Sequence, residues 1–122
     1  MNGALKIFFL IGWAALLAPH PGMAQLSTNK KKAIELYAQA DNFRVRGQYN
    51  AAISLLQEAI GKDRNFVEAY FRLGITFKAM RDFNRANLSL EQGLSIARDP
   101  KKQKGFFLEL GDNYLRDRKS VV

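Results

Sequence analysis

The chain has 122 residues, of which 48% are hydrophobic, and it carries a formal net charge of +8. This length admits one small domain, and the absence of cysteine excludes a disulfide framework, a thiolate metal site and a cysteine nucleophile. The only histidine, His20, and the only tryptophan, Trp13, lie close to the amino terminus.

Residues 1–24 have the features of a secretory signal peptide. Lys6 supplies a basic flank, and residues 7–18 (IFFLIGWAALLA) form an uninterrupted apolar run. Two prolines end the run, and small residues precede a cleavage site after Ala24. An uncleaved membrane anchor is the alternative, although the run is shorter than the roughly 20 residues that span a bilayer core. We therefore predict cleavage after Ala24, with a short segment, 25–29, preceding the folded part.

The excess of basic residues is concentrated in two short runs, 30–32 and 101–104. Such an excess can indicate contact with nucleic acid or anionic lipid. An exported protein seldom meets nucleic acid, and the remaining basic residues are interspersed among acids. We interpret the two runs as solvated helix ends, with contact to an anionic envelope surface as the alternative and no nucleic-acid partner.

Apolar residues recur at a spacing near 3.6, which predicts an all-α chain of five helices. The predicted helices cover residues 30–46, 50–62, 66–80, 84–97 and 101 onward. Ser27, Thr28 or Asn29 can cap the first helix, and short turns separate the others, so successive helices should lie antiparallel. The inward residues expected on the fifth helix are Phe107, Leu110, Gly111 and Tyr114.

A pattern of small and large residues repeats with a period of 34 residues. Leu36, Ala40, Phe43, Tyr49, Ala52, Leu56 and Ala59 recur as Tyr70, Gly74, Phe77, Phe83, Ala86, Leu90 and Gly93. Self-similarity at this period indicates a helical repeat array. The small residues allow two helices to approach closely, while the large ones fill the remaining space.

The stretches 47–53 (GQYNAAI) and 69–77 (AYFRLGITF) resemble the tetratricopeptide repeat family, and 110–114 (LGDNY) restarts the pattern. The resemblance implies an α-α superhelix of about two and a half repeats. Its predicted units are residues 30–65, residues 66–103 and a truncated third unit whose first helix covers 104–116. Three departures, Gln39, Arg64 and Arg81, put the local turn geometry in doubt but leave the repeat intact.

The same resemblance implies that the first helix of each unit lines a concave wall that holds a protein or peptide partner. The predicted partner-binding residues are Tyr37, Asp41, Arg44, Phe71, Ile75, Lys78, Leu108 and Asp112, with Ile34, Glu68 and Leu115 beside them. Tyr37 and Phe71 are 34 residues apart, so we expect them to be neighbours and to anchor a peptide. Alternatively, Phe71 and Ile75 only pack between units.

Some repeat proteins of this kind hold a peptide's terminal carboxylate with paired lysine and asparagine residues. Tyr37 and Asp41 stand at the positions of the first such pair, so we expect no carboxylate clamp. After residue 24 the chain has no histidine base, and its glycines are too isolated to form a phosphate-binding loop. We therefore predict a non-enzymatic scaffold for protein–protein interaction, with no cofactor and no metal.

A signal peptide followed at once by a few such repeats also resembles the front of large Gram-negative envelope proteins. In those proteins the repeats precede a β-propeller-like segment and an OmpA-like peptidoglycan-binding domain. This resemblance implies secretion across the inner membrane to a periplasmic or outer-membrane-associated location. It also implies the alternative function, which is a structural amino-terminal part of a longer protein without binding activity of its own.

The last six residues, 117–122 (DRKSVV), can be encoded by a strand of a common sequencing adapter. We therefore expect a non-native tail on a fragment of a longer reading frame, with a genuine short tail as the alternative.

Overall fold

The computed structural model describes residues 25–121, and the predicted signal peptide lies outside them, as does Val122. Five helices follow one another: α2 (Lys31–Val45), α3 (Tyr49–Lys62), α4 (Val67–Ala79), α5 (Phe83–Ile96) and α6 (Pro100–Val121). The predicted all-α fold is confirmed, and each helix lies close to its predicted range. Within the described part of the chain, no helix is both long enough and apolar enough to cross a membrane.

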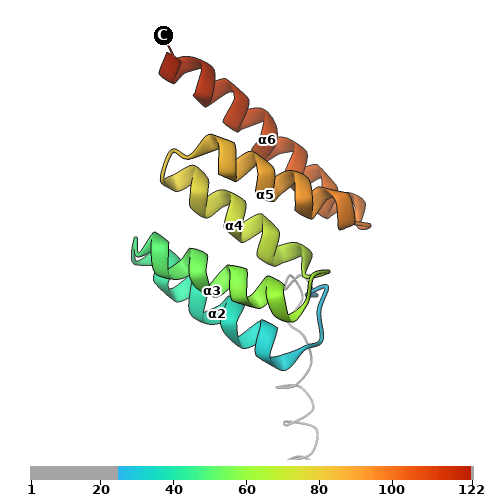
Figure 1. Ribbon diagram of the computed structural model, residues 1–122. Helices are drawn as coiled ribbons and strands as arrows, with labels where there is room; N and C mark the ends of the chain where they lie inside the picture. Colours follow the sequence, from blue (N-terminus) through green and yellow to red (C-terminus); the bar gives the residue numbers. More distant parts are fainter. Residues whose placement is uncertain (1–24, 122) are drawn as a thin grey trace, which may run out of the picture.

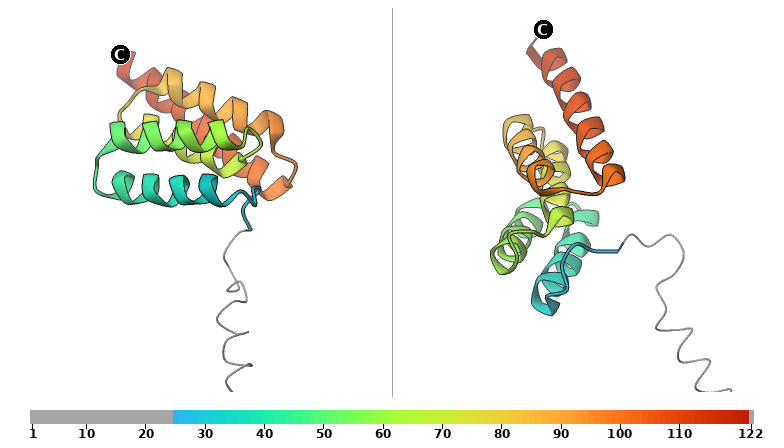
Figure 2. Two further views of the ribbon diagram at one scale, coloured as in Figure 1. Left: turned by 60° about the horizontal axis from the view of Figure 1, so that its bottom comes forward. Right: turned by 90° about the vertical axis from the view of Figure 1, so that its right-hand side faces the viewer.

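The helices form two antiparallel pairs, α2–α3 and α4–α5, and α6 packs against the second pair (Figures 1 and 2). Each helix contacts the next one along the chain, and in addition α2 contacts α4 and α4 contacts α6. The three helices that begin the successive units, α2, α4 and α6, therefore lie in a row. This stacking of helix-turn-helix units is the helical repeat array that the 34-residue period predicts, and it is tetratricopeptide-like, as the resemblance implies.

The turns inside the two pairs have the same geometry, although one contains glycine and the other arginine. Gly47 has φ of 78° and Arg81, 34 residues later, has φ of 61°. The amide of the following residue, Gln48 or Asp82, donates to a carbonyl five residues back at 2.9 or 3.0 Å. The turn geometry that Arg81 put in doubt is thus preserved. A side chain in this left-handed region costs about 1–2 kcal/mol.

Two buried glycines mark the places where helices approach most closely. A Cβ on Gly74 would lie 2.6 Å from Leu90 of α5. A Cβ on Gly93 would lie 2.6 Å from the ring of Phe106 and 2.8 Å from the Cβ of Tyr70. The prediction that small residues at these repeat positions permit close packing is therefore confirmed.

The buried side of α6 differs from the predicted one, and of the four residues expected to face inward only Leu110 is partly buried and packs against the core. Phe106 and Asn113 are buried, at 1% and 0% exposure, whereas Phe107 and Tyr114 are 62% and 53% exposed. Gly111 is also exposed. The predicted side corresponds to the side of α4 that packs against α5, the second helix of its own unit. In α6 the buried side is instead the one that meets the preceding unit, because α5 is the helix present there.

Candidate functional site on the α2–α4–α6 row

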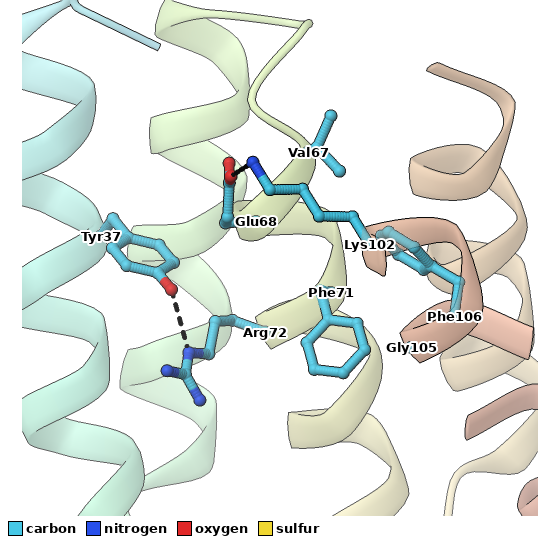
Figure 3. Close-up of a pocket in the computed structure, with 8 residues that line it drawn as sticks. All are labelled: Tyr37, Val67, Glu68, Phe71, Arg72, Lys102, Gly105 and Phe106. Carbon is cyan, nitrogen blue, oxygen red and sulfur yellow. Dashed lines mark hydrogen bonds and ion pairs between the residues drawn. The ribbon is translucent and has the colours of Figure 1, made fainter. Parts of the chain in front are cut away.

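A cavity of about 200 Å³, hereafter the central pocket, opens on the row formed by α2, α4 and α6. Its lining residues are Tyr37, Val67, Glu68, Phe71, Arg72, Lys102, Gly105 and Phe106 (Figure 3). All three helices of the row contribute to it, so the pocket exists only when the two units and α6 are stacked. Its walls are mainly aromatic and aliphatic, and its charged groups lie at the rim.

The aromatic rings of the pocket pack in two separate pairs. The ring of Tyr37 lies 5.0 Å from that of Phe66, and the ring of Phe71 meets that of Phe106 edge-on at 5.2 Å and 86°. Tyr37 and Phe71 were expected to be neighbours, and both line the same pocket. Phe71 also packs between units through Phe106, which is the alternative role expected for it, while its role as a peptide anchor stays a prediction.

Polar contacts tie the rim of the pocket together across helices. The Nζ atom of Lys102 on α6 lies 2.5 Å from a carboxylate oxygen of Glu68 on α4 (Figure 3). The Nε of Arg72 donates to the hydroxyl oxygen of Tyr37 at 3.0 Å and lies 3.6 Å from a carboxylate oxygen of Asp41. These contacts link the three helices around the pocket.

The other charged residues predicted on the wall also form ion pairs. Asp41 is 2.9 Å from Arg44 on the same helix. Farther along the row, Lys78 of α4 bridges to α6, with its Nζ atom 2.7 Å from Glu109 and 2.5 Å from Asp112. The wall therefore presents neutralised pairs instead of isolated charges.

The predicted wall residues do not all gather at one place. Tyr37 and Phe71 line the central pocket, and Asp41 reaches its edge through Arg72. Ile75 is half-buried on α4 without lining the pocket, and Leu108 is exposed on α6. The prediction that these residues bind a partner stays a prediction.

Sequence reasoning missed several pocket residues, among them Phe106. Phe106 stands 37 residues after Ala69, the offset at which the repeat restarts in α6. A large ring therefore occupies the position where α4 carries a methyl group. This replacement of a small residue by a large one was the sequence feature from which Phe106 could have been predicted. Its ring packs beside Phe71.

The amino-terminal segment caps α4 instead of α2. Lys30 is the N-cap of α2, and no side chain accepts a hydrogen bond from its first turn. The Oγ of Ser27 accepts a hydrogen bond from the amide of Val67 at 2.9 Å and donates to Glu68 at 2.6 Å. The expectation that residues 27–29 cap the first helix is wrong, because the chain crosses over to the start of α4.

Glu68 and Lys78 are among the groups on this row whose pKa values are shifted. Burial by itself would raise the pKa of Glu68, but hydrogen bonds from Lys102 and Ser27 outweigh it and hold the pKa below its ordinary value. Burial by itself would lower the pKa of Lys78, but hydrogen bonds to Asp112 and Glu109 outweigh it and raise the pKa. Both groups are therefore stabilised in their charged forms.

We expect the Glu68 pair to make folding sensitive to acid. A carboxyl group whose pKa is lowered by folding stabilises the fold above its ordinary pKa, and this contribution is lost as the pH falls through the folded value. Glu68→Gln should lower the free energy of unfolding by about 1.5 kcal/mol at neutral pH. The difference from the wild type should shrink as the pH falls below 4.5, the ordinary value. Urea unfolding at a series of pH values measures this, and a constant difference would contradict it.

No group of three or more histidine, cysteine or acidic side chains within residues 25–121 is arranged to hold a metal ion. The described residues of this row form an apolar cavity, and the charged side chains at its rim are paired with one another.

Comparison with known proteins agrees with this architecture. The TPR repeat family model matches residues 40–80, from the middle of α2 to the end of α4. A comparison with curated protein sequences gives no match. The fold is therefore assigned from the family model together with solved structures.

Among solved structures, the chain is similar to the second TPR of Spaghetti (RPAP3) bound to the HSP90 peptide SRMEEVD. The two share 18% identity with a TM-score of 0.66 over 75% of this chain and 82% of the other. A tetratricopeptide repeat domain protein from Salinibacter ruber shows 25% identity and a TM-score of 0.57 over 73% and 98%. The MamA protein shows 25% identity and a TM-score of 0.58 over 74% of this chain and 50% of its own.

Proposed function

We propose that this chain, whose fold is a tetratricopeptide-type repeat array, is a non-enzymatic scaffold that binds a peptide segment of a partner protein. The observation that carries the proposal is the central pocket, an apolar cavity spanning α2, α4 and α6. Its volume of about 200 Å³ is below the roughly 300–1,000 Å³ typical of small-molecule and cofactor sites. A cavity of this size suits an apolar side chain of a bound peptide.

The charges around the pocket favour a ligand held by apolar contact. The cations Arg44, Arg72, Lys78 and Lys102 each have an acidic partner within this chain. An acidic peptide tail would have to break these pairs before it could bind. The Spaghetti domains were solved with the peptide SRMEEVD, whereas this chain has Tyr37 and Asp41 where a carboxylate clamp would need lysine and asparagine. We infer that its ligand is anchored by a large apolar side chain.

The proposal is tested by selecting peptides from a random phage-displayed library on the wild-type protein and measuring their affinities for pocket variants. We expect the selected peptides to share a large apolar residue. Phe71→Ala and Tyr37→Ala should each weaken binding about tenfold or more, as loss of a central aromatic contact does. Leu88→Ala is the matched control, because Leu88 is exposed on α5, which contributes nothing to the pocket.

Circular dichroism of the same variants separates a lost contact from a lost fold, and we expect unchanged helicity. Peptides that bind the pocket variants as tightly as the wild type would place the site elsewhere. Peptides that require a free acidic carboxyl terminus would contradict the apolar anchor. Failure to select any peptide would favour a purely structural role in a longer envelope protein.

We also propose that the protein is exported to the periplasm or the outer membrane. The basic flank, the apolar run and the small residues before Ala24 support this. When the chain is produced in a Gram-negative host, the periplasmic fraction should contain a product that begins at Gln25. Ala24→Arg should block processing, since a signal peptidase requires a small residue there. An unprocessed wild-type chain in the membrane fraction would indicate an anchor instead.

A further inference from the structure

Most of the excess basic charge lies at one end of the array, hereafter the basic edge. Because successive helices are antiparallel, the starts of α2, α4 and α6 and the ends of α3 and α5 meet at this end, on the right of Figure 1. The right-hand view of Figure 2 looks onto it. Its segments are residues 25–35, 62–68 and 98–104, which contain nine lysines and arginines but only four acids. The two basic runs of the sequence therefore belong to one surface.

Contacts among described residues join the three segments of the basic edge. The Nζ atom of Lys30 donates to the carbonyl of Lys62 at 3.1 Å, which ties the start of α2 to the end of α3. A cavity of about 530 Å³ is lined by residues of all three segments, among them Ser27, Asn65 and Arg98. The cations of the edge are thus held side by side by the fold.

Most cations of the basic edge are exposed and have no acidic partner. Lys102 pairs with Glu68, and Lys32 pairs with Glu35. The other seven cations of the three segments are exposed, and none of them forms an ion pair with a described residue. Such a surface attracts a partner that carries many negative charges.

The remaining acids of the edge are engaged in local hydrogen bonds. Asp63 accepts a hydrogen bond from the hydroxyl group of Thr28, and Asp99 accepts one from the amide of Lys101 at 3.0 Å. These carboxylates cap backbone turns and do not pair with the seven cations. The net positive charge of the edge therefore remains available to a partner.

The opposite end of the array is different, because its cations are largely neutralised. Arg44 pairs with Asp41 at 2.9 Å on α2, and Arg116 pairs with Asp112 at 2.8 Å on α6. Arg85 pairs with an acid of its own helix start in the same way. The array is therefore electrostatically asymmetric, with one end that favours contact with anions.

The side chains of the basic edge favour an anionic lipid surface as the partner. Their only aromatic residue, Phe66, is fully buried, whereas single-stranded nucleic acids are bound by stacking their bases on exposed aromatic rings. No large apolar side chain of the three segments is exposed, so the contact must be electrostatic. Each lysine or arginine close to an anionic bilayer strengthens binding about fivefold.

The point at which the chain enters the fold also favours a bilayer. Gln25 lies at the basic edge, where its carbonyl accepts a hydrogen bond from the Nζ atom of Lys102 at 3.1 Å. The apolar run 7–18 precedes it by the six residues 19–24, which reach about 20 Å at most. Whenever that run is inserted in a bilayer, the basic edge is therefore held close to the lipid headgroups. This holds for a signal peptide during export and for an uncleaved anchor.

We propose that the basic edge binds the anionic headgroups of a lipid bilayer and turns this end of the array toward the membrane. The partner is a surface rich in a lipid such as phosphatidylglycerol, and the contact uses lysines and arginines from α2, α3 and α6. The proposal does not depend on the peptide-binding function proposed above.

The first test measures flotation of the protein with lipid vesicles. The chain that begins at Gln25 contains all five helices and lacks the apolar run. We expect it to bind vesicles of phosphatidylcholine mixed with phosphatidylglycerol, to ignore vesicles of phosphatidylcholine alone, and to dissociate as salt is added. The combined variant Lys31→Gln, Lys62→Gln and Lys101→Gln should bind about tenfold more weakly or worse.

A second combined variant controls for net charge. Arg46→Gln, Arg81→Gln and Arg116→Gln also remove three exposed cations, but they lie outside the three segments of the basic edge. This variant should bind the mixed vesicles nearly as well as the wild type. Circular dichroism should show the same helicity for both variants, since every substituted side chain is exposed.

The second test uses the full chain and reports on its orientation. The chain contains no cysteine, so a fluorophore can be attached at Asn65→Cys on the basic edge or at Gln48→Cys at the opposite end. In mixed vesicles, spin-labelled lipid headgroups should quench the fluorophore at position 65 much more than the one at position 48. Quenching at position 65 should fall when the vesicles contain phosphatidylcholine alone, because the apolar run then remains as the only attachment.

Four results contradict the proposal. Equal binding or equal quenching in the two kinds of vesicle would show that anionic lipid is not recognised. Equal losses in the two combined variants would show that net charge acts without the basic edge. Displacement by inorganic phosphate, at an ionic strength matched with chloride, would indicate a site for a free anion. Tighter binding of a DNA or RNA oligonucleotide than of mixed vesicles would assign the edge to nucleic acid.

Discussion

Phe106→Ala is expected to lower the free energy of unfolding by about 3–5 kcal/mol, the cost of removing a buried aromatic side chain from a packed interior. Phe106 is 1% exposed and packs in a buried hydrophobic cluster with Leu90 and Ala97 of the preceding segment. Its ring packs over Gly93, where no side chain exists that could move into the vacated space. The substitution should therefore leave a cavity between α5 and α6.

Chemical denaturation measures this loss, and Phe107→Ala provides a control on the same helix. Phe107 is 62% exposed, so its removal should change the free energy of unfolding by about 0.5 kcal/mol or less. The pair of variants also decides which side of α6 is buried. If Phe107→Ala costs more than Phe106→Ala, α6 packs in the register expected from the repeat pattern alone.

Phe106→Ala should also impair the central pocket. The ring forms one wall of that pocket and supports Phe71 at 5.2 Å. A selected peptide should therefore bind the variant more weakly even at temperatures where the variant remains folded. Retained affinity would show that Phe106 is not part of the binding surface.

Gly74→Leu is expected to destabilise the fold by about 3 kcal/mol, at the upper end of the usual cost of overpacking. The first added carbon would lie 2.6 Å from Leu90, whose side chain is fully buried, and 3.3 Å from the carbonyl of Ala86. Neither neighbour can move away without separating α4 from α5. The unit should therefore open at the contact that the repeat pattern identifies as its closest.

Thermal unfolding tests this prediction, with Gly61→Leu and Gly111→Leu as matched controls. Both controls replace a helical glycine whose Cβ would meet nothing within 4 Å. Leucine is a better helix former than glycine by somewhat less than about 1 kcal/mol, so the controls should be neutral or slightly stabilised. An unchanged midpoint for Gly74→Leu would show that the α4–α5 packing assignment is wrong.

The order of the helices and the places of closest approach could be predicted from the chain itself. The 34-residue period arises because each unit buries the same positions against its own partner helix. A glycine such as Gly74 therefore reveals a contact that lies nearby in sequence. The wall residues Tyr37 and Phe71 could be predicted for the same reason, because a repeated unit places equivalent residues in a row.

The pocket rim could not be predicted, because its contacts join different units through side chains that are not among the repeated small and large residues. Lys102 meets Glu68 across 34 residues, and Ser27 caps α4 from 40 residues away. Such pairs depend on how far one unit rotates relative to the next. That rotation results from the packing of all the side chains between units.

The amino-acid sequence by itself determined that this protein is a helical array. Helix periodicity and the alternation of small and large residues are local properties, and each repeat unit contains all the residues that define them. Only the tertiary structure decided which side of α6 is buried. Phe106 and Phe107 are adjacent and equally apolar, so composition does not distinguish them. The packing of α5 against α6 excludes water from the ring of Phe106 and leaves the ring of Phe107 exposed. Burial therefore depends on which helix lies next to α6.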